Sequence, residues 1–495
     1  MRVLFVTSEI APLIKTGGLA DVSAALPAAL HAKGVDVRVL LPGYTQVLSA
    51  MQEMAVIAKF PPSAAGEVTD WPSSRLLLGE LDSGVPVYVL DCPEMYVRGG
   101  GAYQDENKLD WADNGLRFGL LSRIASLLGS AASPLEWVPE VLHCNDWQSA
   151  LTPAYLRYAQ EPVPCVLTVH NLAYQGIFPS ELLPKLGLPW ECYQSDGLEF
   201  YDSLSFLKAG LFYSDHITTV SPSYAKEIQT EELGFGLHGL LVHRNKDLTG
   251  ILNGIDTAFW NPATDEYLQQ TYSVLDSSGK AANKAALQKN LCLKVDAQIP
   301  LFGLVGRFAQ QKGLDLVLEV AEKIIAMPAQ LILLGSGDPD IQRAALQLAH
   351  KHSGKIAAYA GFNEALAHQI EAGADIFLMP SRFEPCGLNQ MYSQRYGTPP
   401  VVHATGGLID TVVDCTVSNL SSGLASGFVF KEMKPAHFIA AIQRAVTLYQ
   451  DQESWRNLQL ICMNKDFSWD TSAQAYKRIY TKLIKNKQSI RVTAT

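Results

Sequence analysis

The first thirty residues, MRVLFVTSEIAPLIKTGGLADVSAALPAAL (1–30), contain a short apolar run, two adjacent glycines and a run of small residues. The apolar run, Val3 to Val6, is typical of a buried strand, and the run from Val22 to Leu30 is typical of a helix. Glycines between a strand and a helix let the backbone approach a ligand, and the helix start presents unpaired N–H groups. Because the stretch matches neither the dinucleotide nor the P-loop pattern, a ligand-binding loop and a simple turn both fit it.

Apolar runs of the same kind recur along the whole chain, separated by longer helical patterns. Their hydrophobicity is continuous rather than alternating, which favours strands buried on both faces of a parallel sheet. The candidate strands are 2–7, 36–41, 85–90, 140–144, 164–169 and 215–220 in the first half, and 300–306, 329–335, 355–360, 374–380 and 399–403 in the second. Strands that alternate with helices predict βαβ units. The polar stretch 242–262 separates the halves, so we expect two doubly wound α/β domains.

Size, charge and cysteine spacing exclude several classes of protein. The chain has 495 residues, of which 48% are hydrophobic, and it carries 39 basic against 49 acidic side chains. The net charge of −10 argues against a nucleic-acid surface, which requires a basic face. The 8 cysteines include no C-x-x-C pair, and no apolar run approaches the length of a membrane span or a signal-peptide core. We therefore expect a cytoplasmic protein that binds neither nucleic acid nor membrane.

Two cations, Arg307 and Lys312, follow the apolar run 300–306. Arginine binds phosphate through two parallel hydrogen bonds, and lysine adds a point charge. In open parallel sheets, ligands bind beyond the carboxyl ends of the strands. The pair therefore suits a diphosphate, although a solvated surface pair fits the same spacing.

The segment 380–388, PSRFEPCGL, lies at the end of the apolar run 374–380. The Glu384 carboxylate can accept hydrogen bonds from sugar hydroxyls, and the N–H groups of Cys386 and Gly387 can donate to them. The alternative is a capping turn with Pro385 at the first helical position.

Asp146 and Trp147 end one strand, and His170 ends the next. A carboxylate beside an aromatic face is common in carbohydrate sites, whereas a lone histidine is usually structural. Histidine spacing gives no metal site. The segment Thr16–Asp21 also recurs with one mismatch as 405–410, which places similar strand–Gly-Gly–helix elements in both halves.

These motifs occur in a fixed order: K-T-G-G-L-A-D (15–21), H-x-x-D-W (143–147), T-V-H-N (168–171), N-G-I-D (253–256), R-x4-K-G (307–313), R-F-E-P-C-G (382–387) and T-G-G-L (405–408). Together they closely resemble the bacterial glycogen synthase and plant starch synthase family of retaining glucosyltransferases, from about residue 1 to residue 480. The resemblance implies the GT-B fold, in which two Rossmann-like domains enclose an interdomain cleft. It implies domains at 1–246 and 247–467 and, within 468–495, a helix that crosses back to the first domain. The tail 487–495 is expected to be frayed, as chain ends commonly are.

The resemblance implies a reaction as well. Glucose would pass from ADP-glucose to the non-reducing end of an α-1,4-glucan such as glycogen, with retention of configuration and release of ADP. No metal or other cofactor is expected. The preference for ADP- over UDP-glucose is inferred from the family alone, and a homo-oligomer is compatible with the sequence.

Roles of individual residues follow from the same resemblance. Arg307 and Lys312 are expected to bind the donor diphosphate and to stabilise charge on the departing ADP. Lys15 and the backbone of Gly17 and Gly18 are expected to face the same diphosphate and the transferred glucose from the other domain.

The resemblance implies further contacts in both domains. Glu384, with the amides of Cys386 and Gly387, is expected to hold the glucosyl hydroxyls, so the implied catalytic residues are Lys15, His170, Arg307, Lys312 and Glu384. The remaining donor-binding positions are Asn253, Phe362 (against adenine), Leu388 and the turn Thr405, Gly406, Gly407 and Leu408 (at the distal phosphate). The implied acceptor-binding residues are Asp21, Asp146 and Trp147.

Other functions fit the residues less well. A glycoside hydrolase requires two carboxylates that flank the bond, but has no use for diphosphate-binding cations. A glucan phosphorylase requires a pyridoxal-phosphate lysine, and no convincing attachment segment is present. Related sucrose-type transferases carry Glu-x7-Glu, whereas Tyr392 stands eight residues after Glu384 here. A glucan-binding protein without activity is the remaining alternative.

Overall fold

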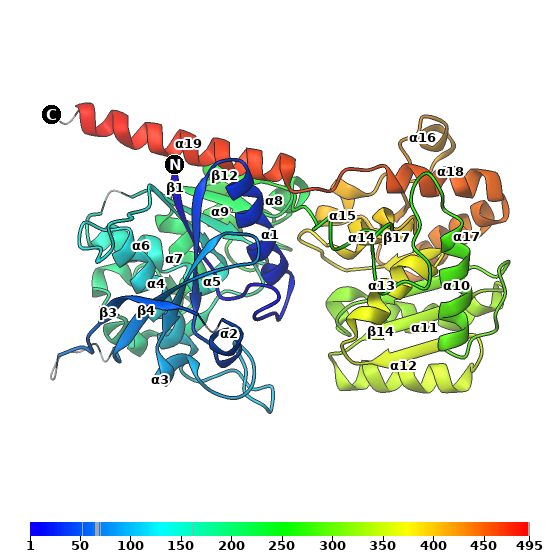
Figure 1. Ribbon diagram of the computed structural model, residues 1–495, viewed down its shortest axis with the longest axis horizontal. Coiled ribbons are helices and arrows are strands. Elements are labelled where there is room, and N and C mark those ends of the chain that lie inside the picture. Colours follow the sequence, from blue (N-terminus) through cyan, green and yellow to red (C-terminus); the bar gives the residue numbers. More distant parts are fainter. Residues whose placement is uncertain (52, 65–68, 70, 162, 494–495) are drawn as a thin grey trace. The chain divides into compact units, whose positions relative to one another are not determined.

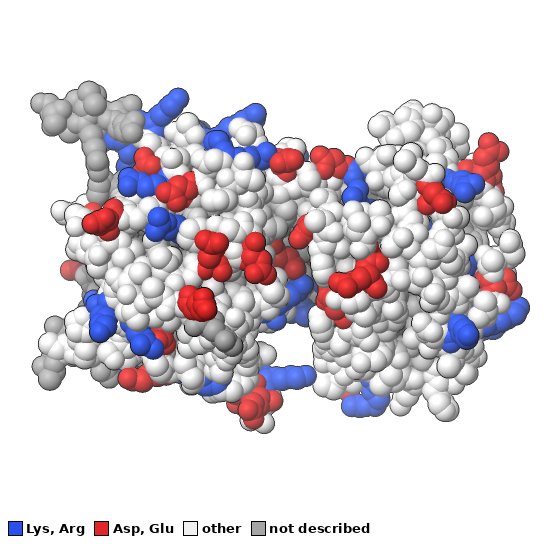
Figure 2. Space-filling view, viewed as in Figure 1, with Lys and Arg blue, Asp and Glu red and all other residues white. Residues whose placement is uncertain are grey.

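The computed structural model describes residues 1–51, 53–64, 69, 71–161 and 163–493 of the chain (Figure 1). The chain divides into two units, each with its own sheet. The first unit contains residues 1–254 and the segment from Trp469 onward, and the second contains Ile255–Ser468. Acidic and basic side chains are interspersed on the viewed face of each unit (Figure 2).

Nine strands of the described chain form the sheet of the first unit, in the order β12-β11-β7-β6-β1-β2-β5-β4-β3. Their bounds are β1 (Arg2–Val6), β2 (Asp36–Pro42), β3 (Ala55–Phe60), β4 (Ser74–Glu80), β5 (Pro86–Asp91), β6 (Val141–Asn145), β7 (Cys165–Val169), β11 (His216–Thr219) and β12 (Leu248–Gly250). The strands from β12 to β5 are parallel, and β4 and β3 continue the sheet in antiparallel pairing. A small antiparallel sheet consists of β8 (Ile177–Pro179), β10 (Ser203–Ser205) and β9 (Glu199–Phe200).

Helices connect these strands. They are α1 (Gly18–Ala32), α2 (Thr45–Ala50), α3 (Pro93–Tyr96), α4 (Asn114–Leu128), α5 (Asp146–Ser149), α6 (Thr152–Tyr158), α7 (Phe206–Tyr213), α8 (Pro222–Glu227) and α9 (His238–His243), with 3-10 turns η1 (Ser180–Leu182), η2 (Pro184–Leu186), η3 (Trp190–Cys192) and η4 (Asn245–Asp247). The first unit extends to Gly254 rather than to the expected residue 246, because β12 pairs with β11 at Ile217 and Leu248 and completes the sheet.

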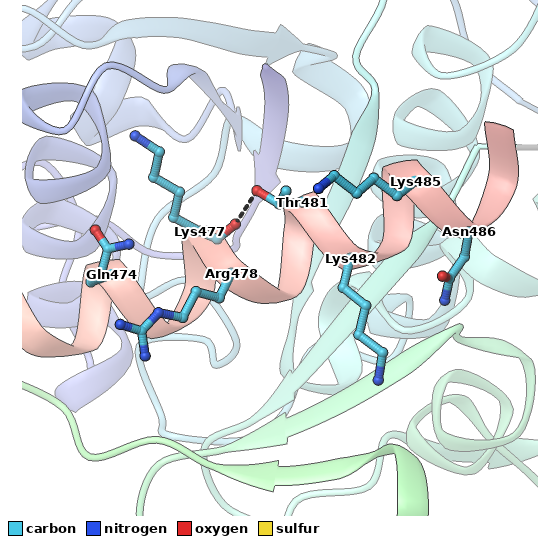
Figure 3. Close-up of a pocket in the computed structure, with 7 residues that line it drawn as sticks. All are labelled: Gln474, Lys477, Arg478, Thr481, Lys482, Lys485 and Asn486. Atoms are coloured by element: carbon cyan, nitrogen blue, oxygen red, sulfur yellow. Dashed lines mark hydrogen bonds between the residues drawn. The ribbon is translucent and has the colours of Figure 1, made fainter. Parts of the chain in front are cut away.

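The last helix, α19 (Asp470–Thr493), belongs to the first unit, although the second unit precedes it in the chain. The Tyr480 hydroxyl lies 2.7 Å from His143 Nδ1, and Lys33 Nζ lies 2.7 Å from Asp470 Oδ1. The tail that the sequence suggests is frayed from residue 487 is helical up to Thr493. The other side of α19 is basic, and Gln474, Lys477, Arg478, Thr481, Lys482, Lys485 and Asn486 line an open surface there (Figure 3).

The sheet of the second unit has the order β15-β14-β13-β16-β17-β18, and its pairs are parallel. The strands are β13 (Leu301–Val305), β14 (Gln330–Gly335), β15 (Ile356–Ala360), β16 (Ile376–Met379), β17 (Pro400–His403) and β18 (Phe428–Phe430). The helices are α10 (Gly279–Asn290), α11 (Leu314–Ala326), α12 (Pro339–Lys351), α13 (Glu364–Gly373), α14 (Asn389–Arg395), α15 (Gly406–Thr411), α16 (Val417–Ser421), α17 (Pro435–Gln450) and α18 (Gln452–Met463), with the 3-10 turn η5 (Gln310–Lys312).

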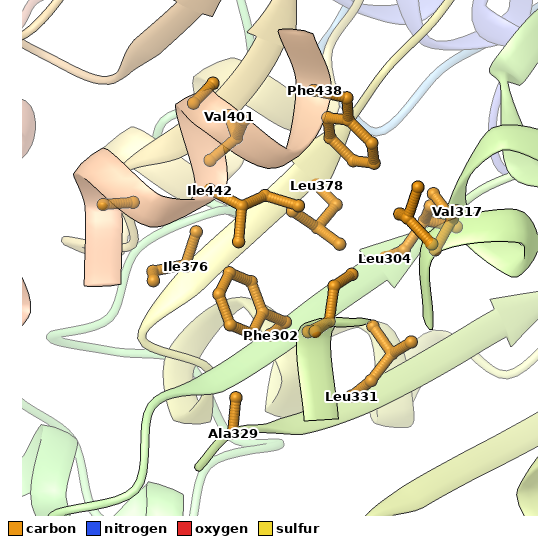
Figure 4. Packing of buried hydrophobic residues seen from close by; sticks show 14 of the residues in the cluster. Phe302, Leu304, Val317, Ala329, Leu331, Ile376, Leu378, Val401, Phe438 and Ile442 are labelled. Atoms are coloured by element: carbon orange, nitrogen blue, oxygen red, sulfur yellow. The ribbon is translucent and has the colours of Figure 1, made fainter. Parts of the chain in front are cut away.

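Both faces of this second sheet are covered by helices. On one face, Phe302 and Leu304 of β13 pack with Val317 of α11 and with Phe438 and Ile442 of α17 (Figure 4). On the other, residues of β13 and β14 pack against α10 and α13; the cluster includes Leu287, Leu301, Ile332, Leu334, Leu366 and Ile370. The prediction of strands buried on both faces is therefore confirmed, and so is a doubly wound architecture in each half.

Each sheet has a point where the direction of chain progression reverses. In the first unit, β1 lies between β2 and β6, and in the second, β13 lies between β14 and β16. Open α/β sheets bind ligands beyond the carboxyl ends of strands at such points. The loops that follow β1, β6 and β7, and those that follow β13, β16 and β17, are therefore the places to look for a site. No helix among the described residues is long and apolar enough to cross a membrane.

Candidate active site

The glycine loop of the first unit is fixed by a buried carboxylate, Glu9, which follows β1. Glu9 Oε2 accepts hydrogen bonds from the N–H groups of Thr16 and Gly17, the latter at 3.1 Å. The Tyr103 hydroxyl donates to Glu9 Oε1 at 2.5 Å. Burial raises the pKa of the Glu9 carboxyl, against the opposing effect of these three hydrogen bonds. Gly17 is the N-cap of α1, and Glu9 bonds the N–H groups of this residue and the one before it, which fixes the chain just before the helix begins.

Lys15 lies in this loop and pairs with Asp21 in the first turn of α1. The Lys15 Nζ–Asp21 Oδ1 distance is 2.8 Å, and 39% of the Lys15 side chain is exposed. The ion pair holds a solvent-accessible ammonium group beside the two glycines. Asp21, expected to contact the acceptor, thus contacts Lys15.

Asp146 joins the loops that follow β6 and β7. It adopts a left-handed backbone conformation (φ 52°), which only a few side chains, aspartate among them, tolerate readily. Its Oδ1 accepts hydrogen bonds from the N–H groups of His170 at 2.6 Å and Asn171 at 3.4 Å. Burial is the largest cause that raises the pKa of Asp146 to about 7, while these hydrogen bonds act in the opposite direction. The carboxyl group therefore titrates near neutral pH.

His170 is half-buried and neutral, because burial lowers its pKa to about 3. Its Nε2 lies 3.0 Å from Asn145 Oδ1. Asn145 Nδ2 donates to the Val6 carbonyl, which fixes the amide so that its oxygen faces the histidine. Nε2 therefore carries the proton, and the Nδ1 lone pair can accept from a ligand hydroxyl.

The structure places the other two predicted residues of this unit in packed surroundings. The Trp147 ring lies among aromatic rings, 5.0 Å from Phe118 and 5.7 Å from Phe178. A Cβ on Gly176 would lie 2.4 Å from the same ring, so glycine is required there. Asn253 is 6% exposed, and its side-chain oxygen has no hydrogen-bond partner among the described residues.

In the second unit, an ion pair joins the motifs that follow β13 and β16. Lys312 Nζ lies 2.6 Å from Glu384 Oε2, which also accepts from the Ser381 hydroxyl at 2.9 Å. Gly313 has φ 69°, and a Cβ there would lie 1.9 Å from the Pro380 carbonyl oxygen. Only glycine permits this close contact, which holds Lys312 beside Glu384.

The Glu384–Leu388 loop packs directly on the Thr405–Leu408 turn. The Gly407 N–H donates to the Glu384 carbonyl at 3.0 Å. A Cβ on Gly407 would lie 2.1 Å from the Cys386 carbonyl oxygen, and Gly387 has φ 73°. The Cys386 side chain is buried, and Leu388 is the N-cap of α14.

Arg307 and Phe362 follow β13 and β15, and both are exposed, Phe362 to 77%. The structure thus brings Lys312, Glu384, Cys386 and the 405–408 turn together at one edge of the second sheet. In the first unit, Lys15, Asp146 and His170 lie in loops at the carboxyl ends of β1, β6 and β7.

Two family models match the chain. A starch synthase catalytic domain covers residues 2–243, and a group 1 glycosyl transferase domain covers residues 293–458. A glycogen synthase of Nitrosomonas eutropha is 56% identical, over 99% of this chain and 97% of its own length. One from Nitrosospira multiformis is 52% identical over 99% and 98%. The chain belongs to the glycogen synthase family.

Solved structures agree with this membership. The catalytic domain of starch synthase IV from Arabidopsis thaliana, bound to ADP and acarbose, is 34% identical, with a TM-score of 0.85 and coverage of 98% of this chain and 99% of that chain. A sucrose-phosphate synthase from Thermosynechococcus elongatus, at 17% identity and a TM-score of 0.61, shares the fold. The predictions of family, of GT-B fold and of a glycosyltransferase enzyme are confirmed.

Sequence reasoning missed three residues that organise this glycogen synthase family site: Glu9, Tyr103 and Ser381. Glu9 and Ser381 each lie just after a predicted strand, and this position could have indicated that they belong to the site. Tyr103 lies in a long polar loop, and no local pattern links it to Glu9. Among the described residues, no group of three or more His, Cys, Asp or Glu side chains is placed to hold a metal ion.

Proposed function

We propose that this protein transfers glucose from ADP-glucose to the non-reducing end of an α-1,4-glucan, retaining the anomeric configuration and releasing ADP. The observation that carries the proposal is the Lys312–Glu384 pair at the reversal point of the second sheet, in a chain whose relatives at 48–56% identity are glycogen synthases. A cation for phosphate and a carboxylate for sugar hydroxyls lie within one ion-pair distance. A nucleotide sugar presents both kinds of group.

The diphosphate is the leaving group of this reaction, and its negative charge grows as the bond to glucose breaks. Arg307 and Lys312 would stabilise that charge, with the turn Thr405–Leu408 at the distal phosphate. Preorganised donors of this kind contribute about 2.7–4 kcal/mol each to the transition state. Lys15 is proposed to act on the same charge, and Phe362 to stack on the base; the ADP in the starch synthase IV structure supports a nucleoside diphosphate ligand.

The sugar is held by neutral and anionic acceptors. Glu384, with the amides of Cys386 and Gly387, would bind glucosyl hydroxyls, and His170 Nδ1 would accept from another. Asn253, whose side-chain oxygen is buried without a partner in the described chain, is suited to accept from the donor sugar. Asp146, Asp21 and Trp147 remain the proposed acceptor contacts. None of these roles requires a metal ion or cofactor.

The acceptor proposal is a glucan such as glycogen, since the relatives are named glycogen synthases. The proposed location is the cytoplasm, where a reducing environment would keep the cysteines in the free state in which the structure has them. A homo-oligomer stays a proposal that sedimentation of the purified protein would test.

The decisive experiment supplies glycogen with glucose-labelled ADP-glucose or UDP-glucose and measures label in the polymer. We expect faster transfer from ADP-glucose, and release of the label as maltose by β-amylase, which attacks α-1,4 bonds from the non-reducing end. Glu384→Gln serves as the inactive reference. Binding of ADP and glycogen without incorporation would instead identify a glucan-binding protein that lacks activity.

A further inference from the structure

His403, the last residue of β17, contacts two neighbouring strand-end loops with its ring. Its Nδ1 lies 2.8 Å from the Ser381 carbonyl oxygen, after β16, and its Nε2 lies 3.3 Å from the Lys431 carbonyl oxygen, after β18. Both partners can only accept, and a neutral imidazole carries one N–H. The shorter contact therefore takes the proton, and Nδ1–H donates to Ser381.

This hydrogen bond lies just beyond the last backbone pairing between β16 and β17. The ladder between β16 and β17 ends at the pair Met379 and Val402, and the next residue of β16's chain is Pro380, which has no N–H. Beyond that point, the His403 side chain takes over the link between the two segments. The ring is packed against Phe430, with centroids 5.3 Å apart, which restricts its orientation.

Ser381 passes this constraint to the candidate active site. It is fully buried, and its hydroxyl donates to Glu384 Oε2 at 2.9 Å, the oxygen that also receives Lys312 Nζ. The Arg382 N–H, next in the chain, donates to the Gln311 carbonyl at 2.8 Å, so Ser381 is held on both sides. Both hydrogen bonds that the structure gives to the Glu384 carboxylate are at Oε2, which orients its Oε1 for other partners.

We propose that His403 is a positioning residue, which fixes Ser381 through Nδ1 and thereby sets the orientation of Glu384 toward the sugar. The inference rests on the proposed function, because it assigns His403 a part in glucosyl transfer. His403 touches neither substrate in this scheme. It should therefore influence kcat more than the affinity for ADP.

Substitution of His403 by asparagine or glutamine tests its two ring contacts one at a time. In His403→Asn, the amide nitrogen of the new side chain would take the position of Nδ1 and keep the Ser381 bond, while His403→Gln should keep only the Lys431 bond. We expect His403→Ala and His403→Gln to lower kcat about tenfold, with ADP affinity changed less than about threefold. His403→Asn should stay within about threefold of the wild type. His350→Ala, at an exposed histidine of α12, is the matched control.

Two results would overturn the proposal: a wild-type kcat for His403→Ala, or equal rescue by asparagine and glutamine. If the alanine variant does not fold, the asparagine–glutamine comparison still decides. A wild-type enzyme that transfers no glucose would overturn the proposed function instead. In that case the melting temperatures of the two amide variants decide: His403→Asn, which keeps the bond to the Ser381 carbonyl, should melt close to the wild type and His403→Gln lower, and equal melting temperatures would refute the link.

Discussion

The Lys312 ammonium lies 2.6 Å from Glu384 Oε2, so an ion pair joins two motifs that are separated in the chain by the elements from α11 to β16. The Glu384 side chain is 7% exposed and that of Lys312 is 25% exposed. A buried carboxylate requires a partner, because an unpaired charge in a poorly solvated site is costly. Lys312 therefore has two tasks, one toward a phosphate ligand and one toward its own protein.

Lys312→Ala should reduce both glucosyl transfer and stability. Loss of the partner leaves the buried Glu384 charge with the Ser381 hydrogen bond but no ion pair, which costs about 1–3 kcal/mol of unfolding free energy, toward the lower end since Lys312 is partly exposed. The double variant Lys312→Ala/Glu384→Gln should recover the stability but not the activity. Urea unfolding and the transfer assay measure the two effects. A double variant as unstable as the single one would contradict the pairing argument.

Arg307→Ala should behave differently, because Arg307 is exposed at the end of β13. We expect a loss of about 2.7–4 kcal/mol of transition-state stabilisation, seen as a fall in kcat/KM at saturating glucan. The unfolding free energy should stay within about 0.5 kcal/mol of the wild type. Arg343→Ala, at an exposed arginine of α12, controls for removal of a positive charge. Transfer kinetics equal to wild type would remove Arg307 from the diphosphate site.

The sequence predicted the buried parallel strands well, since continuous apolar runs report burial on both faces. The run 36–41 became β2 (Asp36–Pro42), and 329–335 became β14 (Gln330–Gly335). The strands that the sequence did not reveal are β3 and β4 at the antiparallel edge, the three strands of the small sheet, and the short strands β12 and β18. The edge strand β3 has only exposed and half-buried positions, in no regular alternation, so it gives no signal of burial. Strands of two or three residues are too short for a periodic signal.

The candidate site was predictable in position but not in connectivity. Strand-end motifs correctly placed Asp146, Glu384 and Lys312 beyond parallel strands, because that location follows from topology. The bond from Asp146 to the His170 N–H depends on a left-handed backbone at Asp146. The hydrogen bonds from the N–H groups of residues 16 and 17 to Glu9 depend on the path of the intervening loop. Neither conformation leaves a pattern in the sequence.

Glu9 offers a test that separates shape from charge. In Glu9→Gln, the amide oxygen can accept from the N–H groups of Thr16 and Gly17, and the amide nitrogen can donate to the Tyr103 oxygen. We expect transfer within about threefold of the wild type for Glu9→Gln, and a loss of more than about tenfold for Glu9→Ala. Steady-state kinetics measure both. Equal losses in the two variants would show that the charge of Glu9 matters rather than its hydrogen bonds.

Asp146 should make stability depend on pH in the sense opposite to an ordinary surface carboxylate. Its pKa is raised from 3.8 to about 7 in the folded protein, so between these values the folded state binds a proton that the unfolded chain has lost. Stability therefore falls as pH rises through that window, by at most about 1.4 kcal/mol per pH unit for one group. Asp146→Asn is a matched variant, because asparagine also tolerates the left-handed backbone and its Oδ1 can accept from the His170 N–H.

The two proteins should thus have similar unfolding free energies near pH 4 and diverge above it, with the asparagine variant the more stable at pH 8. Urea unfolding at pH 4, 6 and 8 measures the divergence. Parallel curves would show that Asp146 is ionised at the same pH in both states, and hence that the buried hydrogen bonds fully offset its loss of hydration. If the asparagine variant is more stable at pH 8 but transfers glucose slowly, the buried carboxylate lowers the stability of the protein and is nevertheless required for the reaction.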